Sequence, residues 1–324
     1  MIDLSIVVVN WNTRALLLEC LASIEGETRA SNDGLHVETL VVDNGSVDGS
    51  VAAVAARFPW AHRITLPRNL GFATGANRGL AAARGRHALL LNSDARLAPG
   101  VLAHCVGHLD AHPAVGIVGP QLLHPDGRPR RSVHNAPGLV SELLPPGLLQ
   151  RLFPRRFPSW RRVGSEPVAV EAVAGAALFL RMELLDRVGP LPEQYFCFLE
   201  ETDWCGRVRR AGWRVEHLPT ATVFHLSGGS SQRKAPARTR IEYHRSLYRF
   251  FREHRGRALM GTVLLLRVGR ALVQVVTRAP LALLGGRHRT RWAVHREVLL
   301  WHLRGCPARE GLAGAAALAS EGRR

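Results

Sequence analysis

Strand and helix patterns alternate four times in the first 95 residues, and this alternation most constrains the fold. Residues 4–9 form an apolar, β-branched run that suits a strand buried on both faces of a parallel sheet. Further strands are predicted at residues 36–42, 62–66 and 87–91, with helices at residues 14–24, 47–58 and 75–84. This order predicts an α/β fold with a Rossmann-like, mostly parallel sheet flanked by helices.

Polar residues follow three of these strands, at residues 10–13, 43–46 and 92–94. In open α/β sheets, ligands bind at the carboxyl ends of the strands. Asp94 could therefore bind a divalent cation together with the phosphates of a nucleotide, and Asp43 could face the same crevice. Ordinary turn and helix-capping chemistry is the alternative interpretation of both residues.

Two other segments have the residue types of a site. The loop of residues 69–79 carries Gly71, Gly75 and Gly79, and glycines before a helix permit close approach to a phosphate. Three carboxylates, Glu200, Glu201 and Asp203, stand near the start of a helix. They could complement the helix dipole, but the flanking aromatic residues suggest a general base in an apolar setting.

Seven motifs then occur in one order across residues 3–232. They are SIVVVNWN, VVDNGSVDGS, NLGFATGANRGL, LLLNSDARL, AGAALFLRMELLDRVG, FLEETDWCGRVRRAGWRV and FHLSGGSS. Together they resemble glycosyltransferase family 2, in particular its bacterial rhamnosyltransferase-like members. The resemblance implies a GT-A fold and an enzyme that inverts configuration at the anomeric carbon of the sugar.

The resemblance also implies roles for individual residues. Asp43 would contact the nucleotide base, and Asp94 would bind Mg²⁺ or Mn²⁺ in a D-x-D-like motif whose first position is Asn92. His225 would be a second metal or phosphate contact. The predicted general base is Glu201, where family members often have Asp, and its extra methylene displaces the carboxylate. The remaining expected site residues are two carboxylates beside the base, Glu200 and Asp203, and the donor-binding residues Asn10, Asn69, Gly71 and Asn77.

The expected function is transfer of rhamnose or another hexose from a nucleotide-diphosphate donor, dTDP-rhamnose or a UDP-sugar, in cell-envelope polysaccharide synthesis. The acceptor would be a saccharide or a lipid-linked saccharide. The alternative is a degenerate, non-catalytic member that binds saccharide or acts as a scaffold, and the Glu at position 201 is its support.

Charge separates the chain into two parts. Residues 1–230 carry 23 basic and 21 acidic side chains, whereas residues 231–324 carry 20 basic and 5 acidic ones. Most of the positive excess in the net charge of +17 therefore lies in residues 231–324. This distribution excludes a uniformly basic nucleic-acid wrapper, and no zinc or helix-turn-helix signature is present. Five widely spaced cysteines without a C-x-x-C pair favour free thiols, and a missing signal-peptide pattern favours the cytoplasm.

We therefore expect a catalytic domain at residues 1–231 and an Arg-rich helical region at residues 232–324. The nucleotide-sugar half would span about residues 1–120 and the acceptor half residues 121–231, with proline-rich loops at residues 120–167. Later strands are predicted at residues 172–180, 214–218 and 222–225, with a flexible link at residues 227–231.

The C-terminal region combines apolar helical faces with marginal Arg and Trp residues, as expected for a segment at the inner face of an anionic plasma membrane. Its longest uncharged run, residues 258–266, is far shorter than a bilayer-spanning helix needs. Pro280 and Gly285-Gly286 are expected to break the helix. The alternative is that these helices pack on the catalytic domain or on a second subunit, which would make the protein a homo-oligomer.

Overall fold

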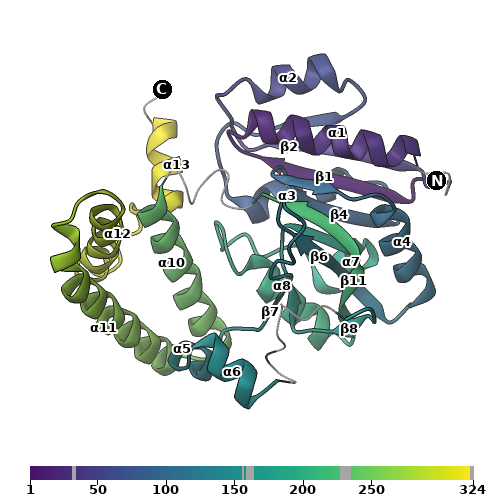
Figure 1. Ribbon diagram of the computed structural model, residues 1–324. Coiled ribbons are helices and arrows are strands. Elements are labelled where there is room, and N and C mark those ends of the chain that lie inside the picture. Colours follow the sequence, from purple (N-terminus) through teal and green to yellow (C-terminus); the bar gives the residue numbers. More distant parts are fainter. Residues whose placement is uncertain (31–33, 155–156, 158–163, 227–234, 322–324) are drawn as a thin grey trace. The chain divides into compact units, whose positions relative to one another are not determined.

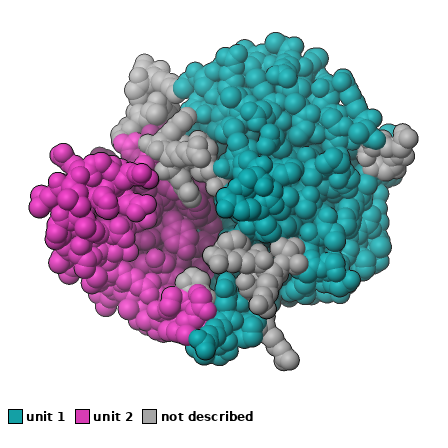
Figure 2. Space-filling model, viewed as in Figure 1, with its two compact units in different colours: residues 1–136, 149–195, 200–230 teal, residues 137–148, 196–199, 231–324 magenta. Residues whose placement is uncertain are grey.

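The computed structural model describes residues 1–30, 34–154, 157, 164–226 and 235–321 of the chain. The chain divides into two compact units (Figure 2). The first comprises residues 1–136, 149–195 and 200–230, and the second residues 137–148, 196–199 and 231–324. The link expected at residues 227–231 lies entirely outside the described residues.

A nine-stranded sheet forms the core of the first unit (Figure 1). Its strands are β1 (Leu4–Asn10), β2 (Val37–Asp43), β3 (His62–Thr65), β4 (His87–Asn92), β5 (Ala95–Leu97), β6 (Val115–Leu123), β8 (Val168–Ala169), β10 (Ala177–Arg181) and β11 (Arg214–His225). Eight of them lie in the order β3-β2-β1-β4-β10-β6-β11-β5, and β8 pairs with β11. Strands β3, β2, β1 and β4 are mutually parallel, as are β6 and β11, whereas β10, β8 and β5 are antiparallel to their partners. The predicted fold class is confirmed.

Helices cover both faces of this sheet. One face packs against α1 (Arg14–Ala30), α2 (Ser50–Arg57) and α4 (Val101–Ala111), and the other against α3 (Phe72–Ala82), α7 (Glu183–Val188) and α8 (Glu200–Arg210). Along β1 the buried side chains alternate between the two cores, with Ile6 and Val8 in one and Val7 in the other. This double burial explains why the strand is apolar at nearly every position.

Three sequence predictions in the second half of the sheet are wrong in detail. Residues 115–123 form β6, although Pro120 lies where loops were predicted to begin. The strand predicted at residues 172–180 is two: β9 (Ala172–Val173) pairs with β7 (Val133–His134) in a small separate sheet, and β10 follows. Conversely, residues 214–218 and 222–225 belong to the single strand β11, whose pairing with β6 shifts register between Leu218 and Thr222.

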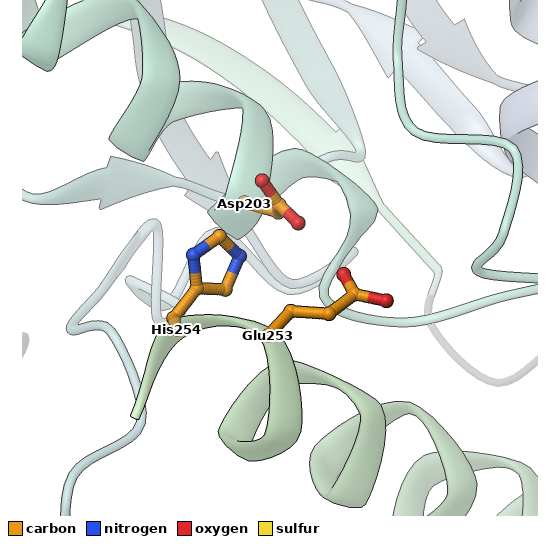
Figure 3. Close-up of side chains that lie close together, drawn as sticks. All are labelled: Asp203, Glu253 and His254. Atoms are coloured by element: carbon orange, nitrogen blue, oxygen red, sulfur yellow. The ribbon is translucent and has the colours of Figure 1, made fainter. Parts of the chain in front are cut away.

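The second unit is helical. It contains α5 (Leu139–Leu143), α10 (Pro236–His254), α11 (Arg257–Ala282), α12 (Gly286–Leu303) and α13 (Gly311–Glu321), while α6 (Pro146–Leu152) spans the division between the units. Glu253 and His254 form the end of α10 (Figure 3). Within the unit, the Tyr248 hydroxyl lies 2.7 Å from His302 Nε2, and Arg245 Nη1 donates to the buried Glu242 carboxylate (2.7 Å).

Helix α11 differs from its sequence-based expectation. It continues through Arg267 and Arg270 for 26 residues and passes Pro280 before it ends at Ala282. By length and composition alone, it is the one helix among the described residues that could cross a membrane, and 11% of its most apolar 18-residue window is buried. The uncharged run of residues 258–266 therefore underestimates the length of the apolar helix, because α11 continues through charged residues.

Candidate active site

The ends of β1, β2 and β4 are joined by a buried network of polar side chains. Asn10 Nδ2 donates to Asp43 Oδ1 (2.9 Å) and to Ser46 Oγ (3.1 Å), and the Ser46 amide donates to Asp43 Oδ2 (2.9 Å). The Thr13 hydroxyl donates to Asn10 Oδ1 (2.6 Å) and lies 2.8 Å from Ser93 Oγ. These bonds fix both oxygens of the Asp43 carboxylate at the sheet edge where a nucleotide would bind.

The loop before α3 is braced by two asparagines. Asn44 Nδ2 donates to Asn69 Oδ1 (3.0 Å) and to the Gly71 carbonyl (2.9 Å), and the Gly71 amide donates to Asn69 Oδ1 (2.9 Å). Gly71 precedes the helix with a φ of 93°, a conformation that glycine adopts without strain. Asn69 and Gly71 therefore set the shape of this loop.

The other two glycines of the motif have a packing role. A Cβ at Gly79 would lie 2.2 Å from Val7 Cγ1, and one at Gly75 would lie 2.9 Å from Val9 Cγ1. They let α3 pack closely on β1, which replaces the idea that all these glycines make room for a ligand.

Asn77 connects α3 to the segment before α8. Its Nδ2 donates to the Leu191 carbonyl and to Glu193 Oε1, both at 2.9 Å, and its Oδ1 accepts from the Leu191 amide (3.0 Å). Both Nδ2 hydrogens are thus used within the protein. The structure places Asn77 as a brace of residues 191–193.

Asp94, between β4 and β5, lies beside His225, the last residue of β11. His225 Nε2 lies 3.0 Å from Asp94 Oδ1, and the Leu226 amide donates to the Asp94 carbonyl (3.0 Å). Antiparallel pairing of Ala95 with His225 brings the two together, and Asn92 lies half-buried at the end of β4.

This pair fits a divalent cation. A separation of 3.0 Å is that of two adjacent ligands of an octahedral ion with bonds of about 2.1 Å. Carboxylate oxygen and imidazole nitrogen are both suitable donors for Mn²⁺, and oxygen for Mg²⁺. The residues present therefore fit the predicted metal.

Glu200 and Glu201 open α8. Glu200 is buried, and its Oε2 has no hydrogen-bond partner among the described residues. Burial, and next the neighbouring Glu201 charge, raise the pKa of Glu200 well above its ordinary value. Burial raises the pKa of Glu201 to about 7. A carboxyl group with such a pKa can exchange a proton near neutral pH.

Backbone strain adjoins the two carboxylates. Phe198 and Leu199 have φ values of 72° and 68°, which cost about 1–3 kcal/mol each in non-glycine residues. Such outliers concentrate at functional sites.

A short chain of contacts connects the carboxylates to the Asp94 strand. The Glu201 side chain lies against Gly175, where a Cβ would be 3.5 Å from Glu201 Cγ. The next residue, Ala176, accepts a hydrogen bond from the Asn92 amide (3.0 Å). Glu201 and Asn92 are 109 positions apart in the sequence, so only the tertiary structure reveals this proximity. Gly175 lies in the AGAALFLRMELLDRVG motif but is not among the site residues predicted above.

Asp203 is also on α8 (Figure 3). Its carboxylate is buried and accepts a hydrogen bond from Arg207 Nε at 3.2 Å, one turn further along the helix. This ion pair is a structural contact within α8, in contrast to the Glu201 carboxylate, which lies beside the loop between β9 and β10.

Comparison with known proteins identifies relatives of this chain. Residues 5–179 match glycosyl transferase family 2. The chain is 29% identical over 263 residues to N-acetylglucosaminyl-diphospho-decaprenol L-rhamnosyltransferase of Mycobacterium tuberculosis, a match that covers 76% of this chain and 83% of that protein.

Solved structures show the same fold at lower identity. The mannosyltransferase PcManGT from Pyrobaculum calidifontis, in complex with GDP-Man and Mn²⁺, is similar with a TM-score of 0.54 and 20% identity over 93% of this chain and 86% of that one. GalNAc-T7 with UDP, GalNAc and Mn²⁺ has a TM-score of 0.54 and 16% identity over 76% of this chain and 47% of that one. These likenesses support a GT-A fold.

Proposed function

Because the chain belongs to glycosyltransferase family 2, we propose that it transfers rhamnose or another hexose from a nucleotide-diphosphate donor with inversion. The proposed acceptor is a saccharide or a lipid-linked saccharide of the cell envelope. The observation that carries this proposal is a carboxylate with a pKa of about 7, Glu201, beside the end of β4, where Asp94 follows and meets His225 from the end of β11.

Glu201 is the proposed general base. Its carboxylate accepts the proton of the acceptor hydroxyl while that oxygen forms a bond to the anomeric carbon. The bond between this carbon and the diphosphate breaks on the opposite face, and its electron pair leaves with the diphosphate. No covalent enzyme intermediate is needed.

Asp94 and His225 are the proposed ligands of Mg²⁺ or Mn²⁺, with Asn92 beside them. When bound, the ion stabilises the negative charge of the diphosphate. Asn10 and Asp43 hold the strand ends in place for the nucleotide, and Asn69 and Gly71 shape the loop before α3.

The donor and acceptor are proposed from the relatives. The Mycobacterium tuberculosis relative is named as a rhamnosyltransferase that acts on a diphospho-decaprenol-linked N-acetylglucosamine. We therefore put dTDP-rhamnose first among the donors and UDP-sugars second, with a lipid-linked saccharide as acceptor.

The test is a panel of nucleotide-sugars with the purified full chain. We expect one donor to raise the unfolding temperature when Mn²⁺ or Mg²⁺ is present and to be consumed when acceptor is added. Asp94→Ala should abolish transfer and metal-dependent nucleotide binding without changing the circular dichroism spectrum. Donor binding without any turnover would support the non-catalytic alternative, and metal-dependent binding that survives in Asp94→Ala would refute the metal site.

We also propose that α11 binds the cytoplasmic face of an anionic membrane. Its exposed side is apolar, where a helix of a water-soluble protein is normally polar. The residues of this stripe, spaced to lie on one side of the helix and its extension, are Leu265, Leu272, Val273, Val276, Leu283 and Leu284. Exposed arginines flank it at Arg257, Arg270 and Arg287, a combination that suits anionic lipid.

Vesicle flotation tests this placement. The full chain should float with phosphatidylglycerol vesicles, weakly with phosphatidylcholine vesicles, and less at high salt. Changing Leu272 and Val276 to Asn should release it, whereas Val47→Asn, at an equally exposed apolar position of the first unit, should not. Equal flotation of both variants would contradict the membrane proposal and favour an interface with a second subunit.

A further inference from the structure

Arg130 is held rigidly beside the Asp94 strand end. Its amide donates to the Leu122 carbonyl (2.8 Å), and its carbonyl accepts from Gln121 Nε2 (2.8 Å) and Ser132 Oγ (2.9 Å). These bonds close a hairpin after β6 and fix the backbone of Arg130 on both sides. The hairpin therefore fixes the point from which the Arg130 side chain extends toward the end of β11.

The guanidinium group of Arg130 reaches the second metal contact. Its Nη1 donates to the main-chain carbonyl of His225 (3.2 Å), and the His225 imidazole lies 3.0 Å from the Asp94 carboxylate. Among the described residues this is its single hydrogen bond, so four of its five N–H groups remain available.

The electrostatic setting agrees with this position. Partial burial lowers the pKa of Arg130, and the negative charge of Asp94 raises it. An arginine remains charged at physiological pH in either case. The fixed positive charge is therefore half-buried and near the group proposed to bind the cation.

The charge balance of the strand end gives this arginine a function. Asn92 is neutral, so the pair at the end of β4 supplies one negative charge, from Asp94. The positive charge of Arg130 lies near enough to Asp94 to interact with it electrostatically. A site with one carboxylate and one guanidinium attracts a dication less and a diphosphate more than a site with two carboxylates would.

We propose that Arg130 binds the donor diphosphate and shares its neutralisation with the divalent ion, so that nucleotide binding persists in part without metal. The ligand class is a nucleoside diphosphate, whose oxygens a guanidinium binds through paired N–H donors. This inference rests on the proposed function at the same site and adds a residue to it.

Isothermal titration calorimetry of the full chain tests the inference with UDP and dTDP as probes, each in Mn²⁺ and in EDTA. Wild-type protein should retain measurable binding of one nucleotide in EDTA. Arg130→Ala should weaken that metal-free binding by about tenfold or more, the scale of a charge-assisted hydrogen bond. Arg130→Lys, which keeps the charge and loses the planar fork, should fall between the two.

Arg128→Ala is the matched control, because it removes a positive charge from the same hairpin. Its guanidinium is exposed and pairs with Asp126 (2.6 Å), so we expect nucleotide affinity within about twofold of wild type. If Arg130→Ala does not fold, Arg130→Gln, which removes the positive charge and keeps a polar side chain with N–H donors, carries the same test.

The outcomes separate this inference from the proposed function. Nucleotide binding in Mn²⁺ with none in EDTA, or equal metal-free binding by wild type and Arg130→Ala, would overturn the role of Arg130 alone. Failure of wild type to bind either nucleotide under both conditions would refute the proposed function instead.

Discussion

Burial shifts the pKa of ionisable side chains toward the neutral form in both units. In the sheet unit, burial raises the pKa of Glu200 and Glu201, the latter to about 7. In the helical unit, burial lowers the pKa of His244 to about 3 and that of His295 to about 4. Desolvation disfavours the charged form in each case, and it also lowers the pKa of His87, His134 and His217 in the sheet unit.

In the helical unit, the surrounding positive charge adds to the effect of desolvation. Residues 231–324 have 20 basic and 5 acidic side chains, so a protonated histidine there would add to an existing positive excess. Arg267 and Arg240 lower the pKa of His244 further, and Arg240 does the same for His295. Burial thus raises the pKa of the proposed base in the sheet unit and makes the helical unit sensitive to acid.

The largest expected effect concerns the base. Glu201→Gln should reduce the transfer rate by about a hundredfold or more, the scale of losing a general base, while donor affinity is kept. Glu200→Gln should reduce it less. In wild type the rate should rise with pH, reach half its maximum near the Glu201 pKa of about 7, and level off roughly one pH unit higher. Initial rates measured from pH 5 to 9 check both points, and a larger loss in Glu200→Gln would exchange the two roles.

A second prediction compares glycines in helices of the two units. Gly79→Ala places a Cβ 2.2 Å from Val7 Cγ1 and should destabilise the sheet unit by about 1–3 kcal/mol. Gly269→Ala in α11 meets nothing within 4 Å and should stabilise its helix by about 0.5–1 kcal/mol. Urea unfolding followed by circular dichroism measures both, and similar effects of the two changes would show that α3 can move away from β1.

The smallest expected effect is on pH-dependent stability. Because the folded unit lowers the pKa of His244 below 6.5, the unfolded chain binds protons first as pH falls. Stability of the helical unit should therefore decline below pH 6.5, by at most about 1.4 kcal/mol per pH unit for each such histidine. Hydrogen exchange of α10 and α12 peptides measures this, and His244→Leu should reduce the decline.

His62→Leu, at an exposed position of β3, is the control and should leave the decline unchanged.

The buried carboxylates should change stability with pH in the opposite direction. Since the folded protein raises the pKa of Glu200, its contribution to stability is lost as pH rises above the ordinary value of 4.5. Glu200→Gln should therefore stabilise the sheet unit at pH 8 more than at pH 4.5, and no difference between these pH values would contradict its burial as a carboxylate.

Local sequence patterns determined the first half of the sheet. Residues 4–9 and 87–91 predict β1 and β4 because a strand buried on both faces must be apolar at nearly every position. The polar residues at strand ends were likewise visible as candidates. The same patterns failed at β6, where glycines and Pro120 resemble a loop, because a strand is also stabilised by its partners, here β10 and β11.

Tertiary structure decided which candidates lie together and which are structural. The fold class, the charge asymmetry and the candidate carboxylates could be predicted from the sequence, since these depend on residue type and short spacing. Other features depend on contacts between residues that are 26 to 131 positions apart in the sequence. They are the proximity of Glu201 to Gly175, the pairing of Asp94 with His225 and the position of Arg130. Only chain folding specifies such contacts, because strand pairing and burial, which set distances and pKa values, arise between segments that are remote in sequence.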